Sequence, residues 1–414
     1  MSIGKIRYMK KQSNTPEIRF QNYEDKWDIE KLINIFGTIR NAFVGTATPY
    51  YVEKGHFYLE SNNVKNGKIN YNSQIFINDE FYEKQRDKWL KTNDIVMVQS
   101  GHVGHTAVIP EELNNTAAHA LIVFTDYKKE VNPYFLNYQF QSNGKRKKLD
   151  LISTGNTIKH ILASEMKDFK MDFPTFEEQI AIGSLFRTLD DLLASYKDNL
   201  ANYQSLKAIM LSKMFPKAGQ TVPEIRLDGF EGEWENKRAD EIFKSVSEKN
   251  RASLSVLSAS QIDGMVLRDE IGIDIKYDEA TLNNYKVVKP GQFVIHLRSF
   301  QGGFALSKLE GITSPAYTII DFIDKVNHLP DFWNSILTSR DFIKRLETVT
   351  YGIRDGKSIS FKDFSSLKFI FPNFKEQQAI GTYFSNLDNL INSHQEKISQ
   401  LETLKKKLLQ DMFI

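Results

Sequence analysis

The stretch Phe173-Pro174-Thr175-Phe176-Glu177-Glu178-Gln179 occurs a second time, 198 residues later, as Phe371-Pro372-Asn373-Phe374-Lys375-Glu376-Gln377. The similarity continues beyond these motifs, with 18 identities in the 43 positions of 173–215 and 371–413. Both copies end on Met-Phe, at 214–215 and 412–413. An internal repeat of this length predicts a duplicated architecture, so we expect both copies to form the same structural element.

A shorter repeat precedes each of these segments. Pro16-Glu17-Ile18-Arg19 recurs as Pro223-Glu224-Ile225-Arg226, and the stretches 16–36 and 223–243 share eight of 21 positions. The segments that lie between the repeats, 37–172 and 244–370, show little similarity to each other. Divergence under packing constraints alone does not explain why only the repeats stayed alike. The alternation therefore predicts a symmetric frame that presents two different working surfaces.

Each long repeat predicts a long helix, from about Glu177 to Phe215 in the first copy. Pro174 suits the start of a helix but not its interior, and no proline and no glycine except Gly183 follows in this run. Apolar positions that recur every three or four residues predict a coiled-coil seam. The expected seam positions are Leu189, Leu192, Tyr196, Tyr203, Leu206 and Met210 in the first copy and Leu387, Leu390, Leu401, Leu404 and Leu408 in the second.

Two equivalent positions of this seam are polar, Asn199 and Lys397, and each is followed by an apolar residue, Leu200 or Ile398. This pattern indicates a local shift of the seam, with the polar pair helping to set its register. A helix of about 39 residues would be roughly 58 Å long. Because the two copies have matched lengths, we expect them to pack against each other, antiparallel, within one chain. The alternative is that each seam dimerises with another molecule.

The two dissimilar segments are typical of mixed α and β structure. Residues 94–98 and 292–297 predict short buried strands that lead into polar loops, and short helices are expected near Asn132 and near Pro330. The expected fold class is α+β, with two globular domains separated by two long helices that pack as an antiparallel intramolecular coiled coil. The predicted segments are 1–172 (first globular domain), 173–215 (first helical spacer), 216–222 (linker), 223–370 (second globular domain) and 371–414 (second helical spacer).

Length and composition restrict the class of protein further. The 414 residues suggest two or three domains, and 41% hydrophobic and 26% charged residues are typical of a globular chain. No apolar stretch is long enough for a membrane span, and the absence of cysteine rules out disulfides and thiolate metal sites. We therefore expect a cytoplasmic protein. The net charge of +2 neither requires nor forbids a nucleic-acid partner, although residues 1–172 carry 24 basic and 20 acidic side chains.

Motifs for catalysis are incomplete throughout the sequence. Residues 352–358 resemble a phosphate-binding loop but have three residues between the glycines where the motif needs four. Asn132-Pro133-Tyr134-Phe135 resembles a methyltransferase tetrapeptide without its second proline, and is better interpreted as a helix N-cap. His102 and His105 lack the surroundings of a zinc site and are expected to be loop histidines. These observations favour a recognition protein without catalytic chemistry or a metal site of its own.

The whole chain resembles the DNA-specificity subunit of type I restriction-modification systems. The resemblance rests on the doubled Pro-Glu-Ile-Arg motif with its following tryptophan, on the doubled Phe-Pro-x-Phe-x-Glu-Gln-x-Ala-Ile-Gly start of each long helix, and on the strand-to-loop signals at 94–104 and 291–302. The segments 155–159 and 356–359 also look like those that precede each helix in the family. The resemblance implies two target-recognition domains that each read one half of a split, asymmetric DNA sequence.

The same resemblance implies that catalysis resides in other chains. Two copies of a methylation subunit would bind the helical frame and methylate adenine N6 with S-adenosylmethionine. A restriction subunit would use ATP and Mg to translocate and cut unmodified DNA. This chain would then hold no cofactor itself, and its helices would set the length of the unspecified spacer between the half-sites.

Direct readout of bases requires polar side chains on exposed loops, and contacts to phosphates require cations. In the first domain the candidates are Asn62, Asn63, Gln99, Ser100, His102 and His105 for bases and Lys145, Arg146, Lys147, Lys148 and Lys159 for the backbone. In the second domain they are Arg298, Ser299, Gln301, Arg354 and Lys357.

Two other functions stay open on the sequence. A two-headed coiled-coil adaptor that binds proteins would show no salt-dependent affinity for DNA. A specificity subunit of a methyltransferase complex without a nuclease would retain DNA recognition and lose only the restriction partner.

Overall fold

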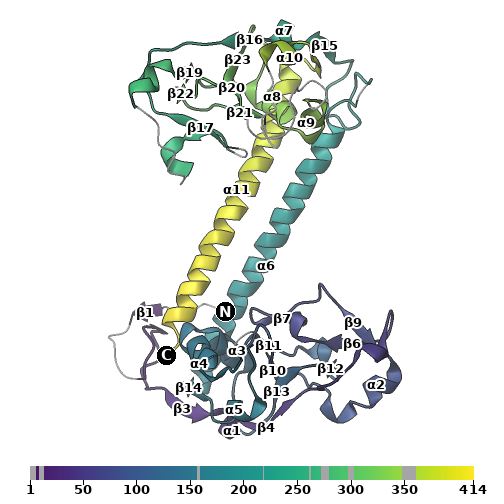
Figure 1. Ribbon diagram of the computed structural model, residues 1–414, viewed down its shortest axis with the longest axis vertical. Coiled ribbons are helices and arrows are strands. Elements are labelled where there is room, and N and C mark those ends of the chain that lie inside the picture. The colour runs from purple at the N-terminus through teal and green to yellow at the C-terminus, as the bar shows by residue number, and fades with distance from the viewer. Residues whose placement is uncertain are drawn as a thin grey trace. The chain divides into compact units, whose positions relative to one another are not determined.

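The computed structural model describes residues 6–8, 14–155, 159–217, 219–260, 263–271, 279–296, 303–346 and 360–414. It divides into two compact units, Met1–Lys197 with Glu396–Ile414, and Asp198–Gln395. Each unit contains part of both long helices, α6 (Phe176–Lys213) and α11 (Phe374–Asp411) (Figure 1). The predicted helices are confirmed, whereas the domain boundaries drawn from the sequence, which give each helix a segment of its own, remain a prediction.

The first unit is of mixed α and β composition. Its strands are β1 (Ile6–Tyr8), β2 (Ile18–Phe20), β3 (Asp28–Lys31), β4 (Phe36–Asn41), β5 (Tyr51–Val52), β6 (His56–Leu59), β7 (Val64–Lys65), β8 (Lys68–Ile69), β9 (Ile75–Ile77), β10 (Ile95–Val98), β11 (Thr106–Val108), β12 (Ala117–Ala118), β13 (Leu121–Tyr127) and β14 (Lys170–Phe173). Its short helices are α1 (Leu32–Ile35), α2 (Asp79–Glu83), α3 (Pro133–Gln141), α4 (Asn143–Ile152) and α5 (Ala163–Met166).

The second unit has a similar composition. Its strands are β15 (Glu235–Arg238), β16 (Phe243–Val246), β17 (Leu257–Ser260), β18 (Gly264–Leu267), β19 (Lys286–Val288), β20 (Phe293–Ile295), β21 (Phe304–Leu306), β22 (Gly311–Thr313), β23 (Thr318–Phe322) and β24 (Lys368–Phe371). Its short helices are α7 (Ala239–Ile242), α8 (Pro330–Leu337), α9 (Arg340–Leu346) and α10 (Phe361–Ser365).

The main sheets of the two units share one topology. The strand order is β11-β10-β13-β4 in the first and β21-β20-β23-β16 in the second, and every pairing in both sheets is antiparallel. A two-stranded sheet accompanies each of them, β14-β3 and β15-β24. The segments 37–172 and 244–370 therefore retain a common fold although their sequences show little similarity, because a pleated core constrains only the alternation of buried residues.

The glutamate of each repeated helix motif forms an ion pair with the arginine of the shorter repeat, fully buried in the first unit and partly buried in the second. Arg19 donates from Nε and Nη2 to the two carboxylate oxygens of Glu178, both at 2.7 Å. In the second unit Arg226 binds Glu376 in the same way, at 2.8 and 2.7 Å. Such two-pronged contacts fix geometry as well as charge, so they hold the start of each long helix against its globular part.

The glutamine and glycine of the motif complete this junction. The Gln179 side chain donates to the Pro174 carbonyl at 3.1 Å and accepts the Asn132 amide at 3.1 Å, and Gln377 repeats both contacts in the second unit. A Cβ on Gly183 would lie 2.8 Å from Asn132 Oδ1, and one on Gly381 would lie 3.0 Å from a methyl group of Leu329. A side chain at either glycine would therefore press on the start of α3 or α8, where the long helix packs against it.

Within each unit the two long helices pack antiparallel. Lys405 Nζ lies 2.6 Å from Asp190 Oδ1 in the first unit, and Lys207 pairs with Asp388 in the second. Both partners of the second pair are related to those of the first by the same shift of 198 residues. The contacts confirm the expected antiparallel pairing within the chain, and each unit makes the same contact at equivalent positions.

The seam between the helices alternates steps of four and three residues. In α6 and the residues that follow it, the buried or half-buried seam positions are Ile182, Phe186, Leu189, Leu193, Tyr196, Leu200, Tyr203, Lys207, Met210 and Met214. In the second copy they are Ile380, Phe384, Leu387, Ile391, His394, Ile398, Leu401, Lys405, Leu408 and Met412. The predicted seam positions Leu189, Tyr196, Tyr203, Met210, Leu387, Leu401 and Leu408 all belong to this set.

Four of the predicted seam residues are wrong. Leu192, Leu206, Leu390 and Leu404 are 40–45% exposed, because the residue that follows each of them occupies the seam instead. Successive helical residues point about 100° apart, so only one of two neighbours can face the partner helix. Asn199 and Lys397 are also exposed, and the seam continues through Leu200 and Ile398 without passing through the polar pair.

The repeated Met-Phe sequence closes the core of each unit. The Phe413 ring lies 6.4 Å from Trp27 and 5.7 Å from Phe186, centroid to centroid. Phe215 lies 6.1 Å from Trp234 and 6.0 Å from Phe384. The tryptophan of each short repeat thus packs on the phenylalanine that ends the long repeat from the other half of the chain, which explains why both were retained in duplicate.

Candidate nucleic-acid interface

The loop after β10 collects four of the predicted contact residues. The Gln99 carbonyl accepts the Ile161 amide at 3.0 Å, Ser100 forms an isolated bridge with His160, and the Gly101 amide donates to the Lys159 carbonyl at 3.2 Å. Gly101 and Gly104 have φ values of +79° and +77°, in the left-handed region, which lets the chain reverse between β10 and β11. Gln99, Ser100, His102 and Lys159 therefore lie at the end of the main sheet where β10 leads into β11.

Gln99 has an unusual environment within this loop. Its side-chain oxygen is buried and makes no hydrogen bond to any residue that the structure describes. A buried acceptor without a partner costs free energy, and such groups in native proteins call for a specific explanation.

The β7–β8 hairpin lies beside this loop and is absent from our sequence-based candidates. Asn66 and Gly67 have φ values of +53° and +82°, the conformation that an Asn-Gly hairpin turn requires. Lys65 and Lys68 flank this turn. The sequence Lys-Asn-Gly-Lys could have indicated these two cations, because an Asn-Gly pair predicts a tight hairpin turn and a lysine lies on each side of it.

His105 connects the hairpin with the loop. Its Nδ1 accepts the amide of Asn66 at 3.3 Å, so the neutral ring carries its proton on Nε2 and presents a donor. Burial lowers the pKa of His105 from the ordinary value of 6.5 to about 4, helped by the charges of Arg146, His102 and Lys65. The imidazole is therefore neutral at physiological pH and suited to hydrogen bonding with a base edge.

The four consecutive basic residues of α4 face different directions. Lys147 and Lys148 are exposed and Arg146 is half-buried, whereas Lys145 is fully buried. Lys145 Nζ binds the Asp172 carboxylate and donates to the Lys170 carbonyl at 3.1 Å. A helix turns about 100° per residue, so one of four successive side chains must point inward. The prediction that Lys145 contacts a phosphate is therefore wrong, because its ammonium group is buried and already bound.

Asn63 also has a structural role. Its side chain accepts the Glu60 amide at 2.9 Å and donates to the carbonyls of Asn70 and Ser73 at 2.9 and 3.0 Å, and it is only 2% exposed. These hydrogen bonds shape the turn before the hairpin and leave the Asn63 amide unavailable to a base, so the prediction that Asn63 reads a base is wrong. The neighbouring Asn62 is exposed.

The candidates of the second unit lie outside the described residues: Arg298, Ser299, Gln301, Arg354 and Lys357. The loop at 352–358 that resembles a phosphate-binding motif also lies outside them.

In the described part of the chain, no three His, Asp or Glu side chains are placed to hold a metal ion. No helix of the described residues is long and apolar enough to cross a membrane.

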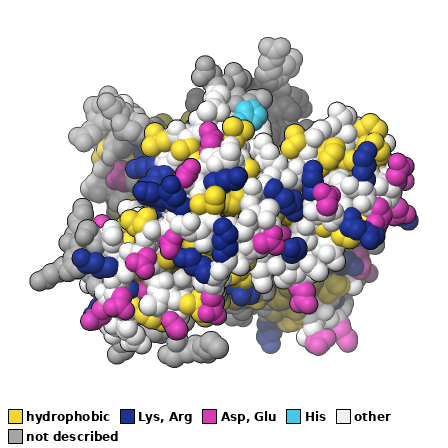
Figure 2. Space-filling view, turned by 90° about the horizontal axis from the view of Figure 1, so that it is seen from below, with side chains coloured by type: hydrophobic (Ala, Val, Ile, Leu, Met, Phe, Trp, Pro, Cys, Tyr) yellow, Lys and Arg dark blue, Asp and Glu magenta, His cyan; other side chains and the backbone are white. Residues whose placement is uncertain are grey.

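Charge is mixed over the surface of the first unit. Figure 2 shows Lys and Arg side chains interspersed with Asp and Glu on the face seen from below, without one extended field of a single sign. This mixture agrees with the net charge of +2 for the whole chain. Any attraction for a polyanion therefore depends on local groups of cations.

Comparison with known proteins identifies the family. Residues 50–203 and 231–403 match the model of the type I restriction modification DNA specificity domain, so the chain carries two such domains. A putative type I restriction enzyme specificity subunit, MjaX, from Methanocaldococcus jannaschii is 21% identical over 96% of this chain and 95% of its own length. The MjaVIII specificity subunit of the same organism is also 21% identical, with the same coverage.

Solved structures agree with this result. The crystal structure of the S subunit of a type I restriction-modification system from M. genitalium has a TM-score of 0.61 at 14% identity, over 97% of this chain and 99% of that one. At this identity the similarity establishes a shared fold. Because the family matches together span more than half of the sequence, the chain belongs to the type I restriction-modification specificity family and is a specificity subunit of that class.

Proposed function

We propose that this chain reads a split, asymmetric DNA target, one half-site with each recognition domain. The observation that carries the proposal is the repetition of the junction contacts and sheet topology in both units, combined with sequences that differ between them. A repeated frame holds two surfaces in equivalent settings. Different side chains on these surfaces suit different base sequences.

In the first half-site, the loop 99–105 and the β7–β8 hairpin would approach the bases. Gln99, at the start of this loop, and His105, whose neutral ring carries a donor on Nε2, are the residues we assign to base edges. Lys147, Lys148 and Lys159 are exposed cations and would contact phosphates. Lys159 lies 3.1 Å from Asp150, so binding a phosphate there would exchange one anionic partner for another.

The helices would set the length of the unspecified spacer. The seam repeats the same steps in α6 and α11 and ends in aromatic contacts within each unit, which supports a stiff element of defined length. A two-stranded antiparallel pair bends less than a single helix, so the gap between half-sites would be constant.

We further propose two methylation subunits as partners. Leu192 and Leu404 are exposed in the first unit, and their equivalents Leu390 and Leu206 are exposed in the second, with the same residue type in every case. Each unit thus offers the same pair of apolar side chains, which suits two copies of one partner. S-adenosylmethionine would bind to those subunits, and ATP and Mg to a restriction subunit, while this chain would contribute neither a cofactor nor a catalytic group.

The test is methylome mapping. The chain would be co-expressed with the methylation subunit encoded beside it in a host without adenine methylation, and N6-methyladenine located by single-molecule sequencing. We expect a split motif with a constant gap that disappears when this chain is omitted. A stable complex that methylates nothing and shows no salt-dependent affinity for DNA would instead support a protein adaptor.

A further inference from the structure

A groove of about 760 Å³ in the first unit lies where the β7–β8 hairpin and α4 meet the two long helices. The residues that line it come from four separate parts of the chain, including the middle of α6 and the last turns of α11. The groove therefore joins the recognition domain to the helical frame within one unit. It lies beside the loop residues that we assign to base reading, through the contact between Asn66 and His105.

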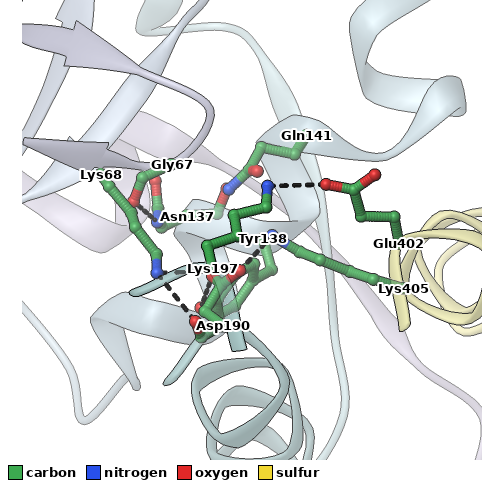
Figure 3. A network of polar contacts seen from close by, with 9 residues as sticks. All are labelled: Gly67, Lys68, Asn137, Tyr138, Gln141, Asp190, Lys197, Glu402 and Lys405. Atoms are coloured by element: carbon green, nitrogen blue, oxygen red, sulfur yellow. Dashed lines mark hydrogen bonds and ion pairs between the residues drawn. The ribbon is translucent and has the colours of Figure 1, made fainter. Parts of the chain in front are cut away.

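Cations dominate the lining of this groove. Lys65, Lys68, Arg146, Lys197, Lys405 and Lys406 line it, against the two carboxylates of Asp190 and Glu402. Both carboxylates are already occupied (Figure 3). Asp190 accepts the Tyr138 hydroxyl at 2.8 Å and binds Lys405 at 2.6 Å, with Lys68 at 3.9 Å, and Glu402 binds Lys197 at 2.6 Å.

Three of the cations form no close ion pair in the described part of the chain. Lys65, Arg146 and Lys406 lie on the hairpin, α4 and α11, and no carboxylate of the described residues comes within 4.0 Å of their nitrogens. Lys65 and Lys406 are exposed and Arg146 is half-buried. Asn66, Asn70, Asn72 and Asn143 add neutral amides to the same lining. Lysine, arginine and asparagine are among the side chains that bind DNA phosphates and sugars.

We propose that this groove holds the sugar-phosphate backbone of the DNA next to the half-site read by the first unit, so that the helical frame contacts the DNA directly. The proposal rests on the split-target function stated above. The three cations come from three separate elements, the β7–β8 hairpin, α4 and α11, and line one groove. That arrangement suits successive phosphates along a strand better than it suits one small anion.

The experiment uses the complex of this chain with its methylation subunit and a fluorescent duplex that contains the mapped motif. The variant K65Q/R146Q/K406Q removes the three free charges. Each lost phosphate contact should lower the slope of log affinity against log salt by about 0.9, so we expect a decrease of about 2 to 3. Affinity should fall by the same factor for a duplex without the motif, and the methylated sequence should not change.

The matched control is K26Q/K54Q/K84Q, which removes the same charge from exposed positions of the first unit outside the groove. A groove variant with the salt slope of this control would overturn the proposal. The single variant K406Q, at an exposed helix position, should lower the slope by about 1 and guards against misfolding of the triple variant. If the wild-type complex methylates its motif while the groove variants bind normally, only the groove proposal fails. If the wild-type complex shows no sequence preference, the proposed function fails.

Discussion

Arg19 and Glu178 form an ion pair with side chains that are 1% and 0% exposed, and its two hydrogen bonds tie the short repeat to the start of the first long helix. Arg226 and Glu376 repeat it in the second unit. Neither residue contributes to a recognition surface. The most strongly repeated residues of the sequence thus serve the junction between frame and domain, whereas the residues assigned to DNA lie in the parts that differ.

Removing one partner of this pair should be costly. Glu178→Ala leaves a buried guanidinium without an anion, and we expect a loss of about 3 to 5 kcal/mol in the free energy of unfolding. Glu24→Ala breaks the exposed pair with Arg7 and should cost less than about 1 kcal/mol. Urea unfolding of both variants measures the difference. Equal losses would show that the junction does not depend on the ion pair.

Lys145→Ala should act on stability and not on DNA contacts. It leaves the Asp172 carboxylate, 4% exposed, without its cation, at a cost of about 3 to 5 kcal/mol. Lys148→Ala, one turn away on the exposed face, should change stability by less than about 0.5 kcal/mol and weaken DNA binding. Unfolding and DNA-binding measurements on the two variants separate these roles. A stable Lys145→Ala protein with weakened DNA binding would reinstate the original assignment.

The two equivalent ion pairs between the long helices should differ in strength. Lys405 and Asp190 are 15% and 7% exposed, whereas Lys207 and Asp388 are 30% and 44% exposed. A double-mutant cycle of Asp190→Asn with Lys405→Gln should give a coupling energy of about 1.5 to 3 kcal/mol. The same cycle at Asp388 and Lys207 should give less than about 1 kcal/mol, because solvent screens the pair. A larger coupling in the second unit would contradict this ranking.

His105 should make stability depend on pH. Because its pKa is lowered to about 4 in the folded chain, the unfolded chain binds a proton first as the pH falls from 6.5. Stability should therefore decrease between about pH 6.5 and pH 4 and level off below, by about 1 kcal/mol after allowance for solvent screening. His105→Asn should flatten this part of the profile, and the exposed-site variant His160→Asn should retain it. A wild-type stability that does not change between pH 6.5 and pH 4 would refute the lowered pKa of His105.

Lengthening both helices should lengthen the DNA gap. Four residues inserted after Asn199 and four after Lys397 add about one turn, or about 6 Å, to each helix. At about 3.4 Å per base pair, the tolerated spacer should grow by about two base pairs while both half-sites stay the same. Methylome mapping of the variant reads both quantities. A changed half-site with an unchanged gap would refute the spacer role.

The seam shows why sequence periodicity left an ambiguity. Leu192 and Leu193 are adjacent leucines, and either continues a pattern of threes and fours. In the structure Leu193 is buried and Leu192 is 43% exposed. At position 207 the seam residue is a lysine, which an apolar pattern skips, although its ion pair with Asp388 makes the position suitable. The period was thus predictable, and the phase of every second position was not.

The sequence by itself determined the duplication and the two long helices, and it indicated the strands that precede the recognition loops and the family, because repeats and apolar periods are properties of local order along the chain. That the helices pair within one chain was an expectation, which the contacts between them confirmed. Only the tertiary structure decided which polar residues are available to a partner. It buried Lys145 and Asn63, exposed four leucines, and brought Lys65, Arg146 and Lys406 together from distant parts of the chain. Such assignments depend on which face of an element packs against a neighbour remote in sequence, and no local pattern contains that information.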